Sequence, residues 1–194
     1  MKKLKVGING LGRIGKGIVS AWIERNMEGL DIVMINDKTE ASSFAHLLKY
    51  DSVHGRLHAD LQAEGHSLVV GGDKRIHLAS CPSPDLIPWA EHGVDIVLEC
   101  TGKFTDRAKA ELHFKQGVKK VIISAPAKNP DITMVLGVNE KSFNPQKHHL
   151  ISNASCTTNC LAPVVKVLHD NFGIERGFMT TVHSYTNDQK ILDK

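Results

Sequence analysis

Residues 4–15 read LKVGINGLGRIG, and this stretch decides the fold. Leu4 to Asn9 is a short apolar run typical of a buried strand, and the six residues from Gly10 to Gly15 match G-x-G-x-x-G. A pattern with apolar residues at helical spacing follows from Ile14 to Arg25. A strand, a glycine-rich turn and a helix in this order predict a unit that binds the phosphates of a dinucleotide.

Each glycine of the turn has a distinct predicted role. Gly10 makes the tight turn, Gly12 lets the backbone approach a pyrophosphate, and Gly15 lets the helix pack closely on the strand. The N-terminus of the helix then favours the anion. We therefore predict that Gly10, Gly12 and Gly15 bind a cofactor; a glycine turn with a purely structural role is the alternative.

An acidic residue stands where such a unit needs one to bind a ribose. Asp37 follows the β-branched run 31–35 and lies 22 positions after Gly15, close to the expected spacing of about 20. A carboxylate accepts hydrogen bonds from both ribose hydroxyls and repels a 2′-phosphate, so Asp37 favours NAD. Lys38 could offset that repulsion, which leaves NADP open, and a turn residue after a strand is the alternative for Asp37.

Strand and helix patterns alternate along the rest of the chain. We expect strands at 31–35, 94–98, 120–124 and 178–183, helices at 41–48, 108–116 and 159–168, and a hairpin of 67–70 with 75–79. Such alternation predicts an α/β fold whose parallel sheet is covered on both faces. We place a domain boundary near residue 150.

Composition excludes several classes of protein. The 194 residues include 24 Lys and Arg against 21 Asp and Glu, a net charge of +3 with the basic residues scattered, so no nucleic-acid partner is expected. No apolar run approaches the roughly 18 residues of a membrane helix, and glycines interrupt any secretory signal. Four cysteines are too few for a disulfide scaffold. We predict a soluble cytoplasmic protein with reduced thiols.

A polar stretch, SNASCTTNC at 152–160, precedes a helical pattern. A thiol near a helix N-terminus loses its proton more readily, and the thiolate is the nucleophile. Cys156 is therefore a candidate nucleophile, and His183, 27 positions later, is a candidate base or cationic partner. A small buried cysteine and a surface histidine are the alternatives, because sequence spacing does not establish that two residues are close.

The other cysteines and histidines do not predict a metal site. Cys156 and Cys160 form C-x₃-C and His148 adjoins His149, which match none of the usual zinc spacings. We expect Cys81 and Cys100 to pack as small apolar residues. Cys160 could act as a resolving thiol under oxidation, although a structural role is favoured.

Five stretches together resemble the glyceraldehyde-3-phosphate dehydrogenase family, and they lie at 6–15, 35–37, 50–55, 152–159 and 180–184. The resemblance covers the whole chain. It implies a Rossmann domain with a doubly wound parallel sheet at 1–150, followed by the start of an α+β catalytic domain at 151–194. It also implies NAD-dependent oxidation of glyceraldehyde 3-phosphate, with inorganic phosphate as the second substrate.

The same resemblance implies residue roles. Cys156 attacks the aldehyde, His183 takes the hydroxyl proton, and phosphate cleaves the resulting thioester. The positions that match substrate or phosphate contacts are Ser155, Thr157 and Thr186. The positions that match cofactor contacts, besides the glycines, are the backbone at Arg13 and Ile14, the Asp37 carboxylate and Ser124.

Two departures qualify the resemblance. The family usually has a basic residue near Pro82 on the adenine side, where this chain has Cys81-Pro82 and leaves only a backbone contact. Family members also continue for on the order of 100 residues beyond the position of Lys194. That part carries an arginine for the substrate phosphate and most subunit contacts, so we expect an incomplete catalytic domain here and a homotetramer at full length.

Two other functions remain open at this stage. Erythrose-4-phosphate dehydrogenase shares the cysteine motif, although Thr186 favours the triose phosphate. The second alternative is a fragment that binds a dinucleotide or a partner without catalysing a reaction.

Overall fold

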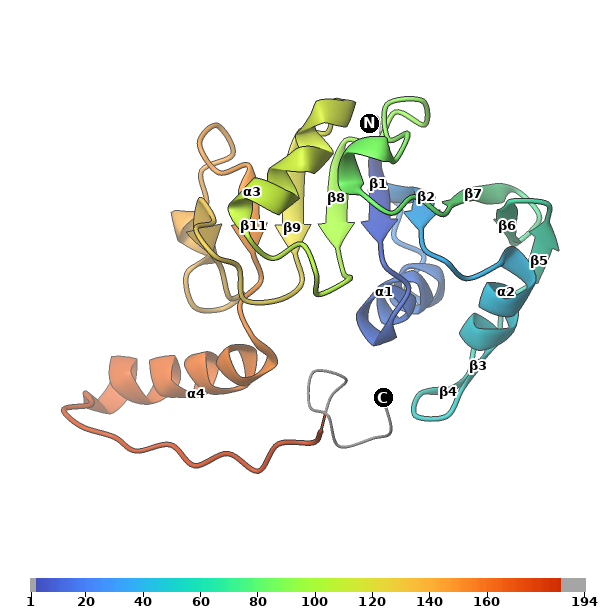
Figure 1. Ribbon diagram of the computed structural model, residues 1–194. Coiled ribbons are helices and arrows are strands. Elements are labelled where there is room, and N and C mark those ends of the chain that lie inside the picture. The colour runs from blue at the N-terminus through green and yellow to red at the C-terminus, as the bar shows by residue number, and fades with distance from the viewer. Residues whose placement is uncertain (1–2, 186–194) are drawn as a thin grey trace.

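The computed structural model describes residues 3–185, and strands and helices alternate through most of it (Figure 1). The helices are α1 (Arg13–Glu24), α2 (Ala41–Lys49), α3 (Arg107–Ala110) and α4 (Cys156–Phe172), with 3₁₀ turns at Pro84–Leu86, Glu111–Gln116 and Glu140–Ser142. The strands are β1 (Leu4–Asn9), β2 (Leu30–Asn36), β3 (Tyr50–Asp51), β4 (Gly55–Arg56), β5 (Leu61–Glu64), β6 (Ser67–Val70), β7 (Lys74–Ala79), β8 (Ile96–Glu99), β9 (Lys120–Ile123), β10 (Ile132–Thr133) and β11 (Leu150–Ser152).

Nine strands form one sheet in the order β10-β11-β9-β8-β1-β2-β7-β6-β5. Every pair from β10 to β7 is parallel, whereas β6 is antiparallel to both β7 and β5. The predicted α/β fold, its doubly wound parallel sheet and its hairpin are thus confirmed. The chain leaves β1 for β2 on one side and later returns to β8 on the other. The carboxyl ends of β1 and β8 therefore meet at the switch point where such sheets bind ligands.

Buried side chains form two clusters, one on each face of the sheet. Met34 and Ile35 are consecutive on β2, yet they belong to different clusters, because successive side chains of a strand point to opposite faces. One cluster is closed by side chains of α1 and α2, which are Val19, Trp22, Phe44 and Leu48. The other contains Trp89, Ala110, Val121 and Leu150. Both faces are covered, as the alternation of elements predicted.

Two glycines at the turn between β1 and α1, Gly10 and Gly15, have no room for a side chain. Gly10 has a φ of +100°, and a Cβ there would lie 2.9 Å from the backbone nitrogen of Thr101. A Cβ on Gly15 would lie 2.1 Å from the carbonyl oxygen of Gly10. Only glycine at both positions lets α1 begin directly behind the strand.

Two predicted elements differ from the structure. The helix expected at 108–116 is α3 followed by a 3₁₀ turn, and it ends at Gly117 in the left-handed conformation, with a φ of +77°. The prediction of a strand at 178–183 is wrong. This stretch has no regular secondary structure, and Phe178 and Val182 are fully exposed. Its apolar residues suit a strand, but a strand also needs a neighbour with which to exchange hydrogen bonds.

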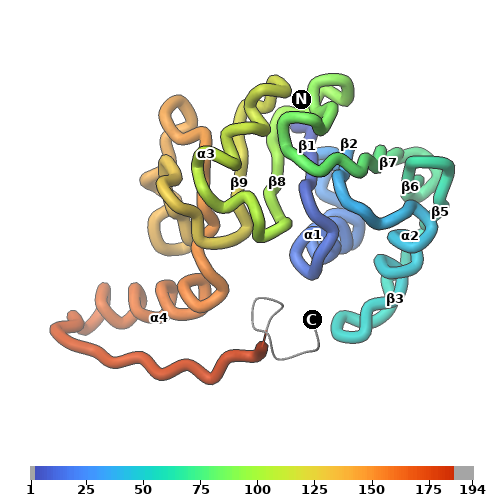
Figure 2. Tube along the Cα trace, viewed as in Figure 1, coloured from blue at the N-terminus to red at the C-terminus, as the bar shows by residue number. Residues whose placement is uncertain are grey.

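Helix α4 and the segment after it lie outside the covered sheet (Figures 1 and 2). The helix begins three residues before its predicted start, and none of its residues is buried. The following segment turns back and returns along the length of α4 (Figure 2). The last strand of the sheet, β11, ends at Ser152. The boundary near residue 150 stays a prediction.

Candidate active site

A cavity of about 280 Å³ lies at the carboxyl ends of the central strands. Gly10 and Gly12 follow β1, Asp37 follows β2, Cys81 and Pro82 follow β7, and Thr101 to Phe104 follow β8; all but Gly102 line the cavity. Three of the sequence-predicted cofactor residues, Gly10, Gly12 and Asp37, are therefore brought together at the switch point of the sheet.

The residues around this cavity fit a dinucleotide. A Cβ on Gly12 would meet nothing within 4 Å, so the backbone there faces open space that a ligand can enter. Gly12 is the N-cap of α1, and it provides no side-chain cap for the first N–H groups of the helix. Uncapped N–H groups at a helix N-terminus are well suited to a pyrophosphate.

Asp37 joins the glycine turn to the end of β2. Its Oδ2 accepts a hydrogen bond from the Leu11 N–H at 2.8 Å, and its Oδ1 accepts from the N–H and the hydroxyl of Thr39. Burial raises the pKa of this carboxyl, but the hydrogen bonds from Thr39, Leu11 and Lys38 outweigh it and hold the pKa below its usual value. Asp37 is thus an anion beside the cavity.

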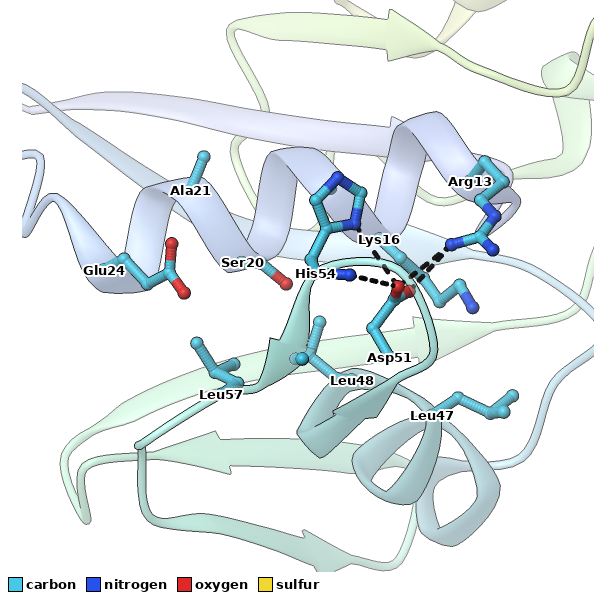
Figure 3. A pocket seen from close by; sticks show the side chains of 12 residues that line it. Arg13, Lys16, Ser20, Ala21, Glu24, Leu47, Leu48, Asp51, His54 and Leu57 are labelled. Atoms are coloured by element: carbon cyan, nitrogen blue, oxygen red, sulfur yellow. Dashed lines mark hydrogen bonds and ion pairs between the residues drawn. The ribbon is translucent and has the colours of Figure 1, made fainter. Parts of the chain in front are cut away.

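Other predicted cofactor residues lie away from this cavity. The Arg13 guanidinium contacts the Asp51 carboxylate at 3.0 Å, and both residues line a second cavity of about 240 Å³ between α1, α2 and the β3–β4 hairpin (Figure 3). Only the backbone of Arg13 therefore remains for a cofactor. Ile14 is half exposed on α1, and Gly15 is buried behind the turn. Ser124 follows β9, and its backbone N–H donates to the Glu99 carbonyl at 3.0 Å.

The candidate nucleophile opens helix α4. Ser155 is the N-cap, and its Oγ accepts a hydrogen bond from the Thr158 N–H at 2.9 Å. Cys156 is the first residue of the helix, and its Sγ lies 3.1 Å from Nε2 of His183. The structure therefore brings together the two candidate catalytic side chains, both of them exposed.

The contacts of this pair favour its charged form. The hydrogen bond from His183 is the main cause that lowers the pKa of Cys156, and the Thr157 N–H and hydroxyl add to it. The Ser184 carbonyl raises the pKa of His183, and the Cys156 sulfur raises it further. A thiolate beside an imidazolium is the state in which cysteine is a good nucleophile.

Two residues that sequence analysis missed shape the turn before Cys156. The Ser152 hydroxyl donates to the Ala125 carbonyl at 2.9 Å and accepts from the Ala127 and Ala154 N–H groups. The Asn159 side chain donates to the carbonyls of Asn153 and Ser155. Both belong to the polar stretch singled out in the sequence, but their roles could not be predicted from it. Two partners of Ser152, Ala125 and Ala127, lie 27 and 25 residues earlier in the chain, and the carbonyls that Asn159 contacts are placed by the turn itself. Thr186, a predicted substrate contact, lies outside the described residues.

Residues 3–185 offer no metal site, no membrane-spanning helix and no disulfide. In this range no group of three or more His, Cys, Asp or Glu side chains could hold a metal ion. Within the same range, every helix is too short or too polar to span a lipid bilayer. All four cysteines are free thiols; Cys81 and Cys100 are half-buried at the edges of the two clusters, and burial raises the pKa of the Cys100 thiol to about 11.

Comparison with known proteins identifies the family. The family described as glyceraldehyde 3-phosphate dehydrogenase, NAD binding domain, matches residues 4–107, and the C-terminal domain of the same enzyme matches residues 155–194. Glyceraldehyde-3-phosphate dehydrogenase of Geobacillus stearothermophilus is 58% identical over 190 residues, and an enzyme of the same name from Thermotoga maritima is 52% identical over 189. These matches cover 98% and 97% of this chain but 56% of each relative, so the chain spans about half the length of the curated relatives it matches.

Proposed function

We propose, from the premise that the chain belongs to the glyceraldehyde-3-phosphate dehydrogenase family, that it carries the cofactor site and the catalytic pair of that enzyme. The proposed reaction converts glyceraldehyde 3-phosphate, NAD and inorganic phosphate to 1,3-bisphosphoglycerate and NADH. The observation that carries the proposal is the contact of 3.1 Å between Cys156 Sγ and His183 Nε2 at the start of α4.

The pair suits the oxidation of an aldehyde. The Cys156 thiolate attacks the aldehyde carbon, and the oxyanion that forms takes the Nε2 proton of the His183 imidazolium to give a hemithioacetal. The hydroxyl proton then returns to the neutral His183 Nε2 as the hydride leaves. NAD, when bound, supplies the acceptor for the hydride that leaves the same carbon. The acyl group is then held by Cys156 as a thioester. Inorganic phosphate attacks this thioester, forms an acyl phosphate and releases the Cys156 thiolate.

The cofactor and substrate contacts are part of the same proposal. The open backbone at Gly12 and the N-terminus of α1 would hold the pyrophosphate, and Asp37 would hold the ribose hydroxyls. Ser155 and Thr157, which flank Cys156, would bind substrate or phosphate oxygens together with Thr186. We further propose that the whole protein is a cytoplasmic homotetramer.

The test is NADH formation by the protein that carries this sequence, measured with glyceraldehyde 3-phosphate and with or without inorganic phosphate. We expect Cys156→Ser to abolish turnover and leave NAD binding unchanged. Cys160→Ser is the matched control, because Cys160 is an exposed thiol one helical turn further along α4. Turnover by Cys156→Ser would contradict the proposal.

The same assay separates the two alternatives. Faster turnover of erythrose 4-phosphate than of the triose phosphate would favour the related dehydrogenase. NAD binding without turnover of either aldehyde would favour a binding fragment.

A further inference from the structure

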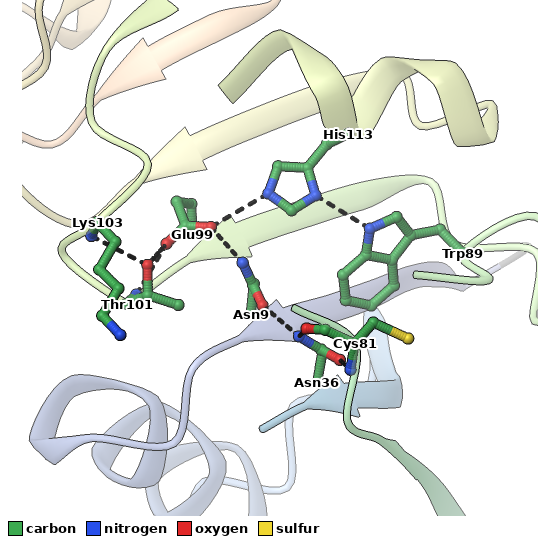
Figure 4. Close-up of polar contacts among 8 residues, drawn as sticks. All are labelled: Asn9, Asn36, Cys81, Trp89, Glu99, Thr101, Lys103 and His113. Atoms are coloured by element: carbon green, nitrogen blue, oxygen red, sulfur yellow. Dashed lines mark hydrogen bonds and ion pairs between the residues drawn. The ribbon is translucent and has the colours of Figure 1, made fainter. Parts of the chain in front are cut away.

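A chain of hydrogen-bonded, buried polar side chains (Figure 4) adjoins the cofactor cavity, which its members Asn9 and Asn36 line. Asn9 ends β1, Asn36 ends β2, Glu99 ends β8, and His113 lies in the 3₁₀ turn after α3. None of these four side chains is predicted to have a role in the proposed reaction, yet all are buried, Glu99 to 1% exposure and His113 completely. Burying a carboxylate is costly unless its oxygens are fully hydrogen-bonded.

The Glu99 carboxylate meets this requirement with four donors. Its Oε1 accepts from the Thr101 N–H at 2.8 Å and from the Thr101 hydroxyl. Its Oε2 accepts from the Asn9 side chain at 2.6 Å and lies 3.1 Å from His113 Nε2. Four donors use the full acceptor capacity of an ionised carboxylate.

The protonation of His113 follows from its other neighbour. Trp89 Nε1 lies 3.0 Å from His113 Nδ1. An indole nitrogen can only donate, so Nδ1 must accept. The proton of the neutral ring is then on Nε2, assigned from the network, and it is donated to Glu99. The Glu99 carboxylate thus accepts hydrogen bonds from four neutral donors.

The network reaches both walls of the cavity. On one side, Glu99 holds Thr101, which lines the cavity together with Lys103 and Phe104. On the other side, Asn9 Oδ1 accepts from the Asn36 side chain at 2.8 Å, and Asn36 Oδ1 accepts from the Cys81 N–H at 2.7 Å. Asn36 also donates to the Cys81 carbonyl. Cys81 lies in the opposite wall, so three successive hydrogen bonds, through Asn36 and Asn9, connect it to Glu99.

We propose that Glu99 is a positioning residue for the cofactor, because one buried carboxylate fixes both walls of the cavity and the glycine turn between them. The turn depends on it because the Cα of Gly10 packs directly against the backbone of Thr101, where a Cβ would clash. The inference rests on the proposed cofactor site, and it adds a residue that does not touch the cofactor but determines how well it fits.

The test is the affinity of the chain for ADP-ribose, a probe with the ribose and pyrophosphate of the cofactor. Glu99→Gln keeps the size of the side chain but replaces one accepting oxygen with a donor, so two of the four donors lose their acceptor. We expect the dissociation constant, measured by calorimetry, to rise about tenfold or more, as for loss of hydrogen bonds to a charged group. Glu64→Gln is the matched control, because Glu64 is exposed on β5 and pairs with Arg75.

A second measurement separates positioning from general stability. Calorimetry is done at a temperature at which circular dichroism shows each variant to be folded, and amide hydrogen exchange is followed in the same samples. Positioning predicts faster exchange at the Thr101 and Cys81 amides together with weaker binding. A lower unfolding temperature with ADP-ribose affinity within twofold of wild type would overturn the inference.

A third variant makes the test independent of whether Glu99→Gln folds. Thr101→Val keeps the shape of the side chain and removes the hydroxyl, which donates to Glu99 and accepts from the Lys103 N–H at 3.0 Å. We expect a rise of a few-fold in the dissociation constant, and a loss in the double variant that is smaller than the sum of the two single losses, because both substitutions disrupt the contact between Glu99 and Thr101. Unchanged affinity in Thr101→Val, or full additivity, contradicts the inference. Failure of the wild-type chain to bind either NAD or ADP-ribose would overturn the proposed cofactor site itself, and this inference with it.

Discussion

The cofactor cavity and the thiol site are built in opposite ways. The cavity lies at the ends of four parallel strands, next to a hydrogen-bonded network in which Asn9, Glu99 and His113 are at most 2% exposed. The thiol site lies on α4, which has no buried residue, and on an exposed segment without regular structure. Its defining feature is one contact, between Cys156 and His183.

This difference separates stability from reactivity. Residues around the cavity also hold the two halves of the sheet together, so a substitution there should change both folding and binding. Residues at the thiol site contribute little to the core, so a substitution there should change thiol chemistry and leave the fold intact. The following four predictions test this separation, starting with the largest expected effect.

Gly15→Ala should be the most damaging change in the packed region. The new Cβ would lie 2.1 Å from the Gly10 carbonyl oxygen, and α1 would have to move away from the turn. We expect the free energy of unfolding to fall by about 2–3 kcal/mol, in the range of overpacked cores, and NAD binding to be lost with it. Urea denaturation gives the free energy.

Gly17→Ala is the control for this change, because it makes the same substitution in the same helix. A Cβ on Gly17 would meet nothing within 4 Å, and alanine is the better helix former by about 1 kcal/mol. Gly17→Ala should therefore stabilise the protein slightly. Equal effects at the two positions would show that the close approach of α1 to the turn is unimportant.

His183→Gln should change reactivity alone. His183 is the main cause of the lowered pKa of Cys156, so without it the pKa rises and less thiolate is present at neutral pH. We expect iodoacetamide to label Cys156 about tenfold more slowly in the variant, with its pH midpoint moved upward, while the urea midpoint stays the same. Mass spectrometry follows Cys156 and Cys160 in one sample. Equal labelling of the two thiols in the wild type would count against the assignment.

Asp131→Asn, at the edge of the packed region, should lower the free energy of unfolding by an amount that depends on pH. Burial raises the pKa of Asp131, but the N–H groups of Leu150 and His149 and the Arg107 guanidinium bring it down to about 2. Because this pKa lies below the unfolded value of 3.8, the carboxylate stabilises the fold above about pH 4. That stabilisation, about 1–2 kcal/mol for a partly exposed group, is lost as the pH falls toward 2.

The unfolding free energies of the wild type and Asp131→Asn should therefore converge as the pH is lowered from about 5 to about 2.5. Asp73→Asn, in the exposed turn between β6 and β7, provides the control. A difference between wild type and Asp131→Asn that is independent of pH would refute the role of the ionised carboxylate.

Lys166→Ala should have the smallest effect. Lys166 contacts Asp170 at 2.7 Å one turn along α4, and the two side chains are 39% and 51% exposed. Water and salt screen such a pair, so the urea midpoint should shift by less than the error of the measurement. A clear loss of stability that salt does not remove would mean that α4 is held more firmly than its exposure indicates.

The sequence predicted most accurately the features whose residue types are determined by their neighbours in the chain. The β1 strand, the glycine turn, the start of α1 and Asp37 follow one another within a short stretch, and each residue type is required by its own backbone or its own neighbour. The hairpin of β6 and β7 is predictable for the same reason. The pairing of Cys156 with His183 stayed one of several alternatives, because a separation of 27 residues says nothing about distance until the segment after α4 is seen to return.

What could not be predicted depends on distant partners. The run at 178–183 has the composition of a strand, but no neighbouring strand pairs with it in the described part of the chain. The network next to the cavity joins Asn9 to Glu99, which are 90 residues apart. One signal was present, a carboxylate that ends the apolar run Ile96–Glu99, yet its four donors become visible only in three dimensions.

The distance of 90 residues between Asn9 and Glu99 has a consequence for the order of folding. β1, α1 and β2 can form from local contacts as soon as they are synthesised, but the amide of Asn9 has no carboxylate to meet until β8 has been made and has crossed to the far side of β1. Closing so long a loop is slow compared with forming a helix. The cofactor cavity should therefore be among the last parts of the sheet to mature, so that a dinucleotide would bind the completed sheet and could not template its early assembly.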